Sequence, residues 1–293
     1  MHIGTDQLGS SINRLHLRRA LNQIYDHPDD YDLEHRRDGD DIRFYCELVR
    51  KLLPATVIEL GCGTGRITVP LAQVAARNNL NIIGVDSGAE MLDKARQHLA
   101  ETPFEIRQRL KFVESDMRSW RAERAVELIV VPCSSISHVL SLGDQLELWR
   151  VGYDNLAEGG RFVVEVQMPN LATFAQSFSR PPRVLTEVDL DVTDPQTKSR
   201  LLRHKSTSYV SNEQMASIRF VYERFEKTVS VERYIDDFAS HVYFPRELQL
   251  LFMHTGFEVE AVYGDYHFRP LEPASQLIIM VGRKPESLRD ASR

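Results

Sequence analysis

The sequence is poor in cysteine, and none of its cysteines lies close to another. Cys46, Cys62 and Cys133 are the three cysteines among 293 residues. Their odd number and the lack of a Cys-x-x-Cys pair argue against a disulfide framework and against a structural zinc site. We therefore expect a chain from a reducing compartment whose fold rests on an ordinary hydrophobic core.

Basic charge and long apolar runs are also lacking. The formal net charge is −6, which weakens any function that needs a basic surface for nucleic acid. No run approaches the ~18 apolar residues of a membrane span. The first residues, MHIGTDQLGSSINRLHLRR, carry no apolar segment of the signal-peptide type. These absences predict a cytoplasmic protein that binds neither a membrane nor nucleic acid.

Short apolar segments alternate with amphipathic ones along most of the chain. Buried strands are expected in TVIEL, NIIGVD, LKFVESD, ELIVVP and RFVVEV, and helices in DIRFYCELVRKLL, ITVPLAQVAARNN, AEMLDKARQHLA and DQLELWRVGYDNL. Continuous apolar strands separated by helices are typical of a parallel sheet that is covered on both faces. The pattern predicts an α/β fold.

The rhythm changes after Met168. Residues 168–243 are rich in β-branched and aromatic side chains, and in VLTEVDLDV the residues Val184, Val188, Leu190 and Val192 alternate along one face. This pattern indicates an antiparallel sheet with one solvated face. Helix and strand alternation returns at FPRELQLLFMHTGF. We therefore predict an α/β core at 1–167 and 244–293, interrupted by a β-rich insert at 168–243.

The segment VIELGCGTGR is the strongest motif. Gly61, Gly63 and Gly65 follow the first predicted strand, where a doubly wound sheet binds nucleotide-like ligands. Glycine lets the backbone approach a ligand that a Cβ would exclude. Arg66 replaces the third glycine of the dinucleotide motif, and the P-loop pattern is absent as well.

Acidic residues mark three successive strands of the predicted sheet. Glu59 precedes the first glycine, Asp86 closes NIIGVD, and Asp116 follows LKFVE. With the glycine turn, this order resembles the class I S-adenosylmethionine (SAM) methyltransferases. The resemblance implies that Asp86 binds the ribose hydroxyls, that Asp116 binds the adenine amine, and that Met91 and Met117 pack near the adenine. The cofactor set it implies is Tyr25, Glu59, Gly61, Cys62, Gly63, Gly65, Asp86, Ser87, Met91, Asp116, Met117 and Cys133.

The resemblance also implies details of the fold. TGFEVEAVYGDY and SQLIIMVGRK resemble the hairpin that ends the family's Rossmann-like seven-stranded sheet, in which the last strand is antiparallel. YDHPDDYDLEHR resembles the tyrosine-bearing lid of glycine/sarcosine and aminosugar N-methyltransferases, so residues 1–40 are expected to form a helical lid. In that small-molecule branch an insert covers the active site. Here residues 168–243 would do so, or would form the face of a possible homodimer.

The acceptor site is expected around PCSSISHVL, which resembles that branch's loop after the fourth strand. His138 is the candidate catalytic residue, as a general base or a hydrogen-bond partner, although a packing role is equally open. The candidate substrate residues are Tyr31, Ser134, Ser135, His241, Tyr243 and Tyr266. The metal-ligand spacing of some O-methyltransferases is not visible, so no metal is expected.

Several functions fit these residues. We favour direct in-line transfer of a methyl group from SAM to a small molecule, at nitrogen rather than oxygen, which leaves S-adenosylhomocysteine as product. An O-methyltransferase acting on a phenol or carboxylate is the alternative. A SAM-binding protein without activity remains open. The Pro132-Cys133 pair also resembles cytosine-5 methyltransferases of nucleic acids, but the acidic stretch 26–43 would repel phosphates.

Overall fold

The computed structural model describes residues 25–36, 39–179 and 184–286. They fall into two compact units. The core unit holds residues 28–170 and those from His241 onward, and the insert unit holds Leu171–Ser240 together with residues 25–27. Residues 1–24, most of the predicted lid, lie outside the described residues.

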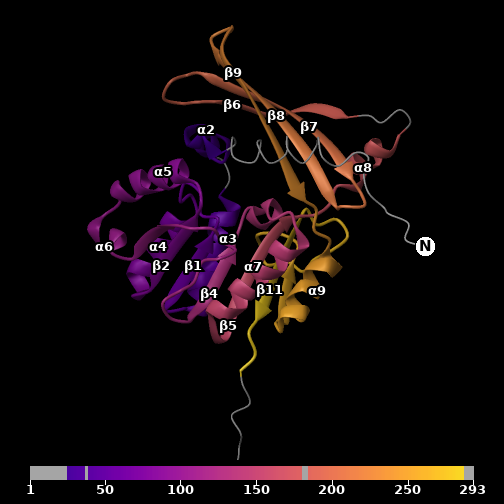
Figure 1. The fold of residues 1–293 in the computed structure, drawn as a ribbon. Helices are drawn as coiled ribbons and strands as arrows, with labels where there is room; N and C mark the ends of the chain where they lie inside the picture. Colours follow the sequence, from indigo (N-terminus) through magenta and orange to yellow (C-terminus); the bar gives the residue numbers. More distant parts are fainter. Residues whose placement is uncertain (1–24, 37–38, 180–183, 287–293) are drawn as a thin grey trace, which may run out of the picture. The chain divides into compact units, whose positions relative to one another are not determined.

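The core unit is built on a seven-stranded sheet (Figure 1). Its strand order is β10-β11-β5-β4-β1-β2-β3. The strands are β1 (Thr56–Leu60), β2 (Asn81–Asp86), β3 (Leu110–Glu114), β4 (Val126–Val131), β5 (Leu156–Gln167), β10 (Glu258–Tyr263) and β11 (Leu277–Arg283). The first five are parallel to one another, whereas β11 runs antiparallel to β5 and to β10. The predicted Rossmann-like sheet with its antiparallel last strand is therefore confirmed.

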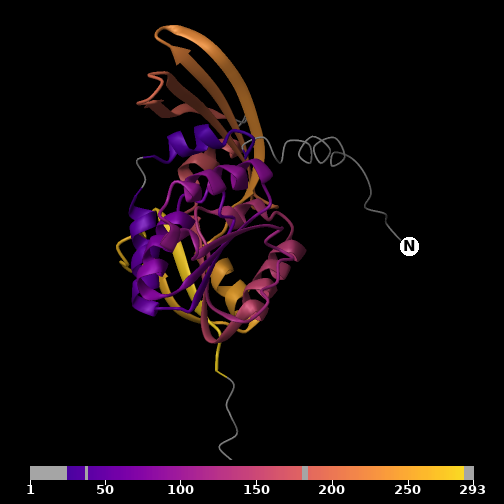
Figure 2. The ribbon, with the colours of Figure 1, turned by 90° about the vertical axis from the view of Figure 1, so that its left-hand side faces the viewer.

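Helices cover both faces of this sheet, as two perpendicular views make clear (Figures 1 and 2). One face carries α3 (Asp40–Leu52), α4 (Thr68–Asn78), α5 (Ala89–Ala100) and the short α6 (Phe104–Arg107). The other carries α7 (Leu142–Asn155) and α9 (Pro245–Thr255). The preceding helix α2 (Pro28–Glu34) lies beside α5. The carboxyl ends of the central parallel strands therefore meet at one edge, where such sheets bind ligands.

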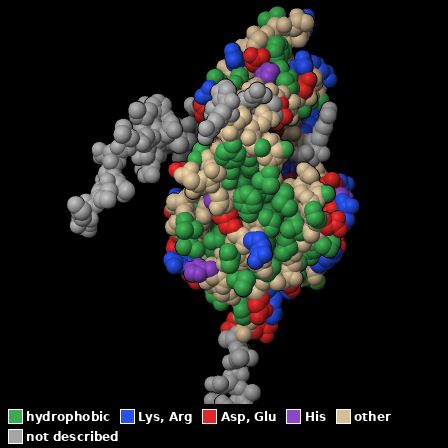
Figure 3. Space-filling model, turned by 90° about the vertical axis from the view of Figure 1, so that its right-hand side faces the viewer, with side chains coloured by type: hydrophobic (Ala, Val, Ile, Leu, Met, Phe, Trp, Pro, Cys, Tyr) green, Lys and Arg blue, Asp and Glu red, His purple; other side chains and the backbone are tan. Residues whose placement is uncertain are grey.

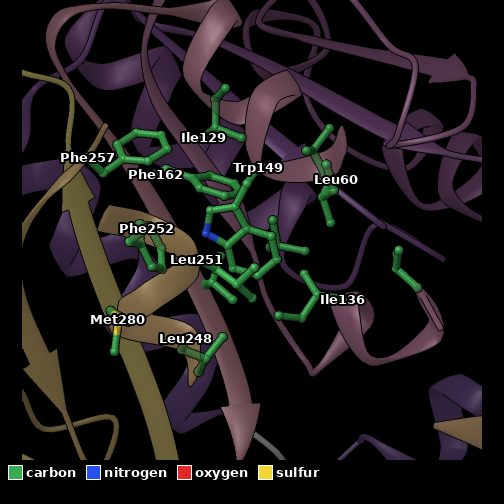
Figure 4. Close-up of a cluster of buried hydrophobic side chains, with 14 of the residues drawn as sticks. Leu60, Ile129, Ile136, Trp149, Phe162, Leu248, Leu251, Phe252, Phe257 and Met280 are labelled. Atoms are coloured by element: carbon green, nitrogen blue, oxygen red, sulfur yellow. The ribbon is translucent and has the colours of Figure 1, made fainter. Parts of the chain in front are cut away.

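Trp149 occupies the middle of the hydrophobic layer between the sheet and the pair α7 and α9 (Figure 4). Its ring meets Phe162 of β5 and Phe252 of α9 edge-on, at centroid distances of 5.9 and 5.7 Å. Ile136, from the segment after β4, belongs to the same buried cluster. Because aromatic pairs prefer edge-to-face packing, this layer fixes α7 and α9 against β5. It also fixes the segment that follows β4.

The insert unit contains a four-stranded sheet in the order β6-β7-β8-β9. The strands are β6 (Leu185–Thr193), β7 (Arg200–Val210), β8 (Met215–Glu226) and β9 (Val229–His241), preceded by α8 (Leu171–Ala175) and a 3₁₀ turn (Gln176–Phe178). The pairs β6–β7 and β7–β8 are antiparallel. An antiparallel β-rich insert is therefore confirmed.

The predicted alternation in the first insert strand is wrong in detail. The register shifts between Val188 and Leu190, so one extra residue interrupts β6. A bulge of this kind changes which face the following side chains occupy. Val184 and Val188 are 57% and 52% exposed, so both side chains reach the surface.

Hydrophobic side chains also reach the surface of the core unit. They gather on the side that α9 occupies (Figure 3), where Leu250 and Met253 of α9 are exposed. Scattered apolar side chains are ordinary on protein surfaces. None of the helices in the described ranges is long and apolar enough to cross a membrane.

We expect Gly282→Ala to destabilise the core by about 1–3 kcal/mol, the usual cost of overpacking. A Cβ at this position of β11 would lie 2.3 Å from a ring carbon of Phe252. Gly143→Ala is the matched control, because only Ser141 Oγ, at 4.0 Å, lies near its added Cβ. Urea unfolding of both variants measures the difference. Equal stability of the two would contradict the packing described here.

Candidate functional site

The turn after β1 is a tight backbone loop, and three of its positions have backbone angles that glycine adopts without strain. Gly61, Gly63 and Gly65 have φ values of 76°, 52° and 74°. These lie in the left-handed region that favours glycine. The amides of Gly61 and Cys62 donate to the carbonyl of Val85 in β2, at 2.8 and 3.1 Å. The turn is thereby fastened to the end of the second strand.

Asp86, at the end of β2, joins this turn to the next one. Its Oδ2 accepts from the Gly63 amide and its Oδ1 from the Gly88 amide, both at 2.8 Å. Burial raises the pKa of Asp86, while these backbone donors lower it. Each carboxylate oxygen has a second lone pair, so a ligand with two neighbouring hydroxyls could still donate to it. Ser87 follows with an exposed side chain.

Two methionines reach the glycine turn from different elements. The methyl carbon of Met91 in α5 lies 3.2 Å from the place of a Cβ on Gly63. The methyl carbon of Met117 lies 3.3 Å from the same place on Gly61, and Ser135 Cβ lies 2.8 Å from it. The structure therefore gathers Asp86, the glycines, both methionines and Ser135 at one edge of the sheet.

Glu59 lies beneath the turn, inside β1. It is buried, and Thr68 Oγ1 donates to its Oε2 at 2.7 Å. Burial raises the pKa of Glu59 to about 8. A carboxyl group that is protonated in this way can support the turn from below. Its partner in the structure is the first turn of α4.

Asp116 lies two residues beyond β3 and is already engaged. The guanidinium Nε of Arg118 lies 2.9 and 3.0 Å from its two oxygens, and the Arg118 amide donates at 2.8 Å. Arg118 also forms an ion pair with Asp144 of α7, at 3.2 Å. The hydrogen bond from Arg118 lowers the pKa of Asp116. A ligand amine at Asp116 would have to share the carboxylate with this arginine.

The segment after β4 has an unusual backbone. Cys133 and Ser134 have φ values of 54° and 58°, two consecutive left-handed residues that are not glycine. Such residues cost about 1–3 kcal/mol each and gather at functional sites. The amide of Gln167 donates to Ser134 Oγ at 3.1 Å, and Ser135 Oγ donates to the Pro132 carbonyl at 2.9 Å. The 3₁₀ turn η2 (Ser135–His138) follows.

Arg66, the residue that breaks the dinucleotide motif, pairs with Asp41 in the first turn of α3. Its Nη1 donates to Asp41 Oδ1 at 3.1 Å, its Nη2 donates to Oδ2, and Nη2 also lies 3.1 Å from Cys133 Sγ. Burial lowers the pKa of Arg66, but the bonds to Asp41 outweigh it and the guanidinium stays charged. Burial raises the pKa of the Cys133 thiol well above its usual value.

Glu165 in β5 is another buried carboxyl group at this edge. Tyr45 of α3 and Tyr266 of the β10–β11 connection each donate a hydroxyl to it at 2.7 Å. Burial raises the pKa of Glu165. Sequence reasoning named Tyr266 and missed Arg66, Asp41, Tyr45 and Glu165. Of these missed residues, Glu165 could have been noticed in the sequence, because it is the single acidic residue inside the apolar run RFVVEV.

His138 ends η2 and is only partly exposed. Burial lowers its pKa to about 4, so the ring is neutral at neutral pH. A neutral imidazole can accept a hydrogen bond or a proton. Cys133, which the sequence places five residues earlier, contacts Arg66 and Asp41 instead.

The other predicted substrate residues have different surroundings. Tyr243 is 1% exposed and packs near Trp149, and burial raises its pKa. His241 Nε2 contacts Glu247 Oε1 at 2.9 Å. Tyr31, on α2, packs its ring on His35. Tyr25 belongs to the insert unit, so its contact with a cofactor stays a prediction.

Comparison with known proteins identifies one segment of the chain. Residues 57–160 match the model of a methyltransferase domain. That segment contains the glycine turn, Asp86, Asp116 and the turn after β4. This part of the chain is a class I SAM-dependent methyltransferase domain.

The methyltransferase domain has curated relatives and solved neighbours. A trans-aconitate 2-methyltransferase of Methylobacterium radiotolerans is 35% identical over 153 residues, which are 51% of this chain and 52% of that protein. One of Azoarcus sp. is 39% identical over 75 residues, 26% of each chain. The chain thus matches about half or less of the length of these relatives.

Solved structures resemble the whole fold. The CcbJ methyltransferase of Streptomyces caelestis superposes with a TM-score of 0.68 and 22% identity, over 84% of this chain and 95% of that one. The sugar N-methyltransferase KedS8 of a Streptoalloteichus species gives 0.61 and 15% identity, over 98% and 97%. At these identities the likeness establishes the fold alone.

We expect Arg66→Gln to lower the free energy of unfolding by about 3–5 kcal/mol, because it leaves the buried Asp41 carboxylate without its partner. The side chains of this pair are 12% and 5% exposed. Arg43→Gln is the control, since its partner Asp40 and Arg43 itself are well exposed. Its loss should stay below about 1 kcal/mol. Chemical unfolding at pH 7 measures the stability of both variants. If both lose a similar free energy of unfolding, the Arg66–Asp41 pair does not stabilise the fold as described.

Proposed function

We propose that the chain is a methyltransferase that moves the methyl group of SAM to a nitrogen of a small-molecule acceptor. One observation carries the cofactor assignment. The Asp86 carboxylate holds the amides of Gly63 and Gly88 and keeps lone pairs for a ligand. The family match over residues 57–160 supports the same assignment.

The residues around the glycine turn suit the parts of SAM. Asp86 would accept the two ribose hydroxyls, and Met91 and Met117 would contact the adenine beside the turn. Asp116 would accept the adenine amine and share it with Arg118. SAM supplies an electrophilic methyl group on a sulfonium, so the protein has to align an acceptor and exclude water.

The charges near the turn after β4 support a nitrogen acceptor. Asp41 and Glu165 lie in this region, and the Arg66 guanidinium, which contacts the Cys133 thiol, is already paired with Asp41. A polyanionic acceptor would need unpaired cations, whereas an amine is tolerated by nearby carboxyl groups. His138, whose pKa burial lowers to about 4, is neutral at pH 7 and would accept a hydrogen bond from the amine, although so low a pKa makes it a weak proton acceptor.

Transfer to a carboxylate oxygen is the second candidate. It is favoured by the curated relatives, which are named trans-aconitate 2-methyltransferases. A panel of amino sugars, amino acids and tricarboxylic acids with labelled SAM distinguishes the two. If the label appears in a tricarboxylic acid and in none of the amines, transfer to oxygen replaces the nitrogen proposal. SAM binding without transfer to any acceptor would favour a protein that has lost activity.

Other predictions from the sequence remain proposals. These are a cytoplasmic location, the lack of a nucleic-acid partner, a homodimer, and an insert that covers the acceptor or forms the dimer face. In the described ranges, no group of three or more acidic, histidine or cysteine side chains could hold a metal ion. The substrate roles of Tyr31, Ser134, Ser135, His241, Tyr243 and Tyr266 also remain predictions. Of these, Tyr243 fits least well, because its side chain is almost fully buried.

We expect Asp86→Ala to weaken SAM binding by at least about 10- to 100-fold, because each hydrogen bond to a charged group contributes about 1.5–3 kcal/mol. Isothermal titration calorimetry measures the change. Asp93→Ala is the control, since Asp93 lies on α5 with an exposed side chain and pairs with the neighbouring Arg96. Unchanged affinity in Asp86→Ala would remove the cofactor assignment.

We expect Cys133→Ser to keep turnover within about three-fold, because the buried thiol is protonated at neutral pH and a thiol is a poor nucleophile. The rate with an identified acceptor is the measurement. A covalent adduct with a cytosine-containing nucleic acid that disappears in Cys133→Ser would instead revive the cytosine-5 mechanism.

A further inference from the structure

Helix α2 is tied to the glycine turn by a small polar cluster that the methyl-transfer proposal does not use. Thr64, the residue between Gly63 and Gly65, donates its hydroxyl to Asp32 Oδ1 at 2.6 Å. Asp32 lies on α2, and Thr64 is completely buried. A helix that precedes the core in sequence is thus bonded directly to the loop that would hold the cofactor.

His98, near the end of α5, completes the cluster. Its Nδ1 lies 3.0 Å from the Thr64 carbonyl, and its Nε2 lies 3.2 Å from Asp32 Oδ2. Both partners are acceptors, because a carbonyl and an ionised carboxylate offer no hydrogen. A neutral imidazole carries one N–H and can satisfy only one of them. The geometry therefore fits the doubly protonated, charged ring.

The Asp32 carboxylate supports the same protonation state. Its Oδ2 is buried, and among the described residues no donor reaches it with full hydrogen-bond geometry, so the His98 ring at 3.2 Å is its ion-pair partner. The charge of His98 at 3.2 Å therefore compensates that oxygen. The nearby charged groups are Lys94 on α5, whose Nζ bonds Asp29 of α2 at 2.6 Å, and Glu101 after α5. Lys94 strengthens the link between the two helices and opposes protonation of His98.

We propose that His98 is a positioning residue whose protonation fastens α2 onto the glycine turn, and so couples cofactor binding to pH. When His98 loses its proton, one of its two contacts is lost and Asp32 Oδ2 is left without compensation. Helix α2 then detaches more often from Thr64. The docking of α2 can be measured without a ligand, whereas its effect on the affinity for SAM rests on the proposed function.

The direction of the pH dependence follows from the ion pair. Asp32 raises the pKa of His98 above 6.5, and burial opposes it less strongly. A raised pKa means that the stabilisation is complete below pH 6.5 and is lost as pH rises through the folded value. Because both side chains are partly exposed, we expect an effect of about two- to five-fold.

Hydrogen exchange of the intact, unliganded protein tests the docking. Between pH 6 and pH 8.5 the protection factors of the α2 amides should fall by about two- to five-fold. In His98→Gln they should be low at both values, and in His98→Lys the charge should keep them more nearly constant. His254→Gln, an exposed histidine of α9, should behave as the wild type. Protection that does not change with pH, or that changes equally in His98→Gln, would overturn the proposal.

Calorimetric titration with SAM at the same two pH values tests the coupling. The dissociation constant of the wild type should rise by about the same factor between pH 6 and pH 8.5, and that of His98→Gln should stay flat. Affinity of the wild type that does not change with pH would overturn the coupling. If SAM does not bind at either pH, the proposed function is rejected instead. The hydrogen-exchange result on the docking of α2 does not depend on that outcome.

Discussion

The hydrogen bonds from the Gly63 and Gly88 amides to Asp86 are the contacts on which the site depends. They join the turn after the first strand to the turn after the second, across neighbouring parallel strands. Because the sheet holds β1 beside β2 in a fixed register, the carboxylate and the glycine backbone are presented together. Met91, Met117 and Ser135 then lie so close to Gly61 and Gly63 that a Cβ at either glycine would crowd them. The sheet thus brings these side chains together at one place.

Charge organises the neighbouring part of the edge. Arg66 and Asp41 neutralise each other, and Glu165 is held by two tyrosine hydroxyls. Buried pairs of this kind rarely add stability over apolar packing, so their presence beside a strained turn suggests a role in function. The left-handed Cys133 and Ser134 are held in place by these contacts and by the amide of Gln167. In the described part of the chain, the guanidinium beside this turn is therefore already paired, which suits the amine acceptor that we propose.

Much of the fold was predictable, because its signals are local. The glycine turn, the apolar strands and the antiparallel close of the sheet all follow from short patterns in the sequence. The bulge between Val188 and Leu190 was not predictable, since the register of β6 depends on its partner strand β7. The four-residue α6 is too short for its periodicity to be read. Within the site, Asp86 and the methionines follow from motif spacing. Asp41 and Tyr45 could not be found, because they meet Arg66 and Glu165 only through the packing of α3.

The most direct measurement of the central claim is a crystal structure with S-adenosylhomocysteine bound. The account predicts ribose hydroxyls within hydrogen-bond distance of the Asp86 carboxylate, adenine between the turn and the methionine side chains, and the sulfur beside the turn after β4. A nucleoside bound elsewhere, or an Asp86 carboxylate that touches only Gly63 and Gly88, would contradict it.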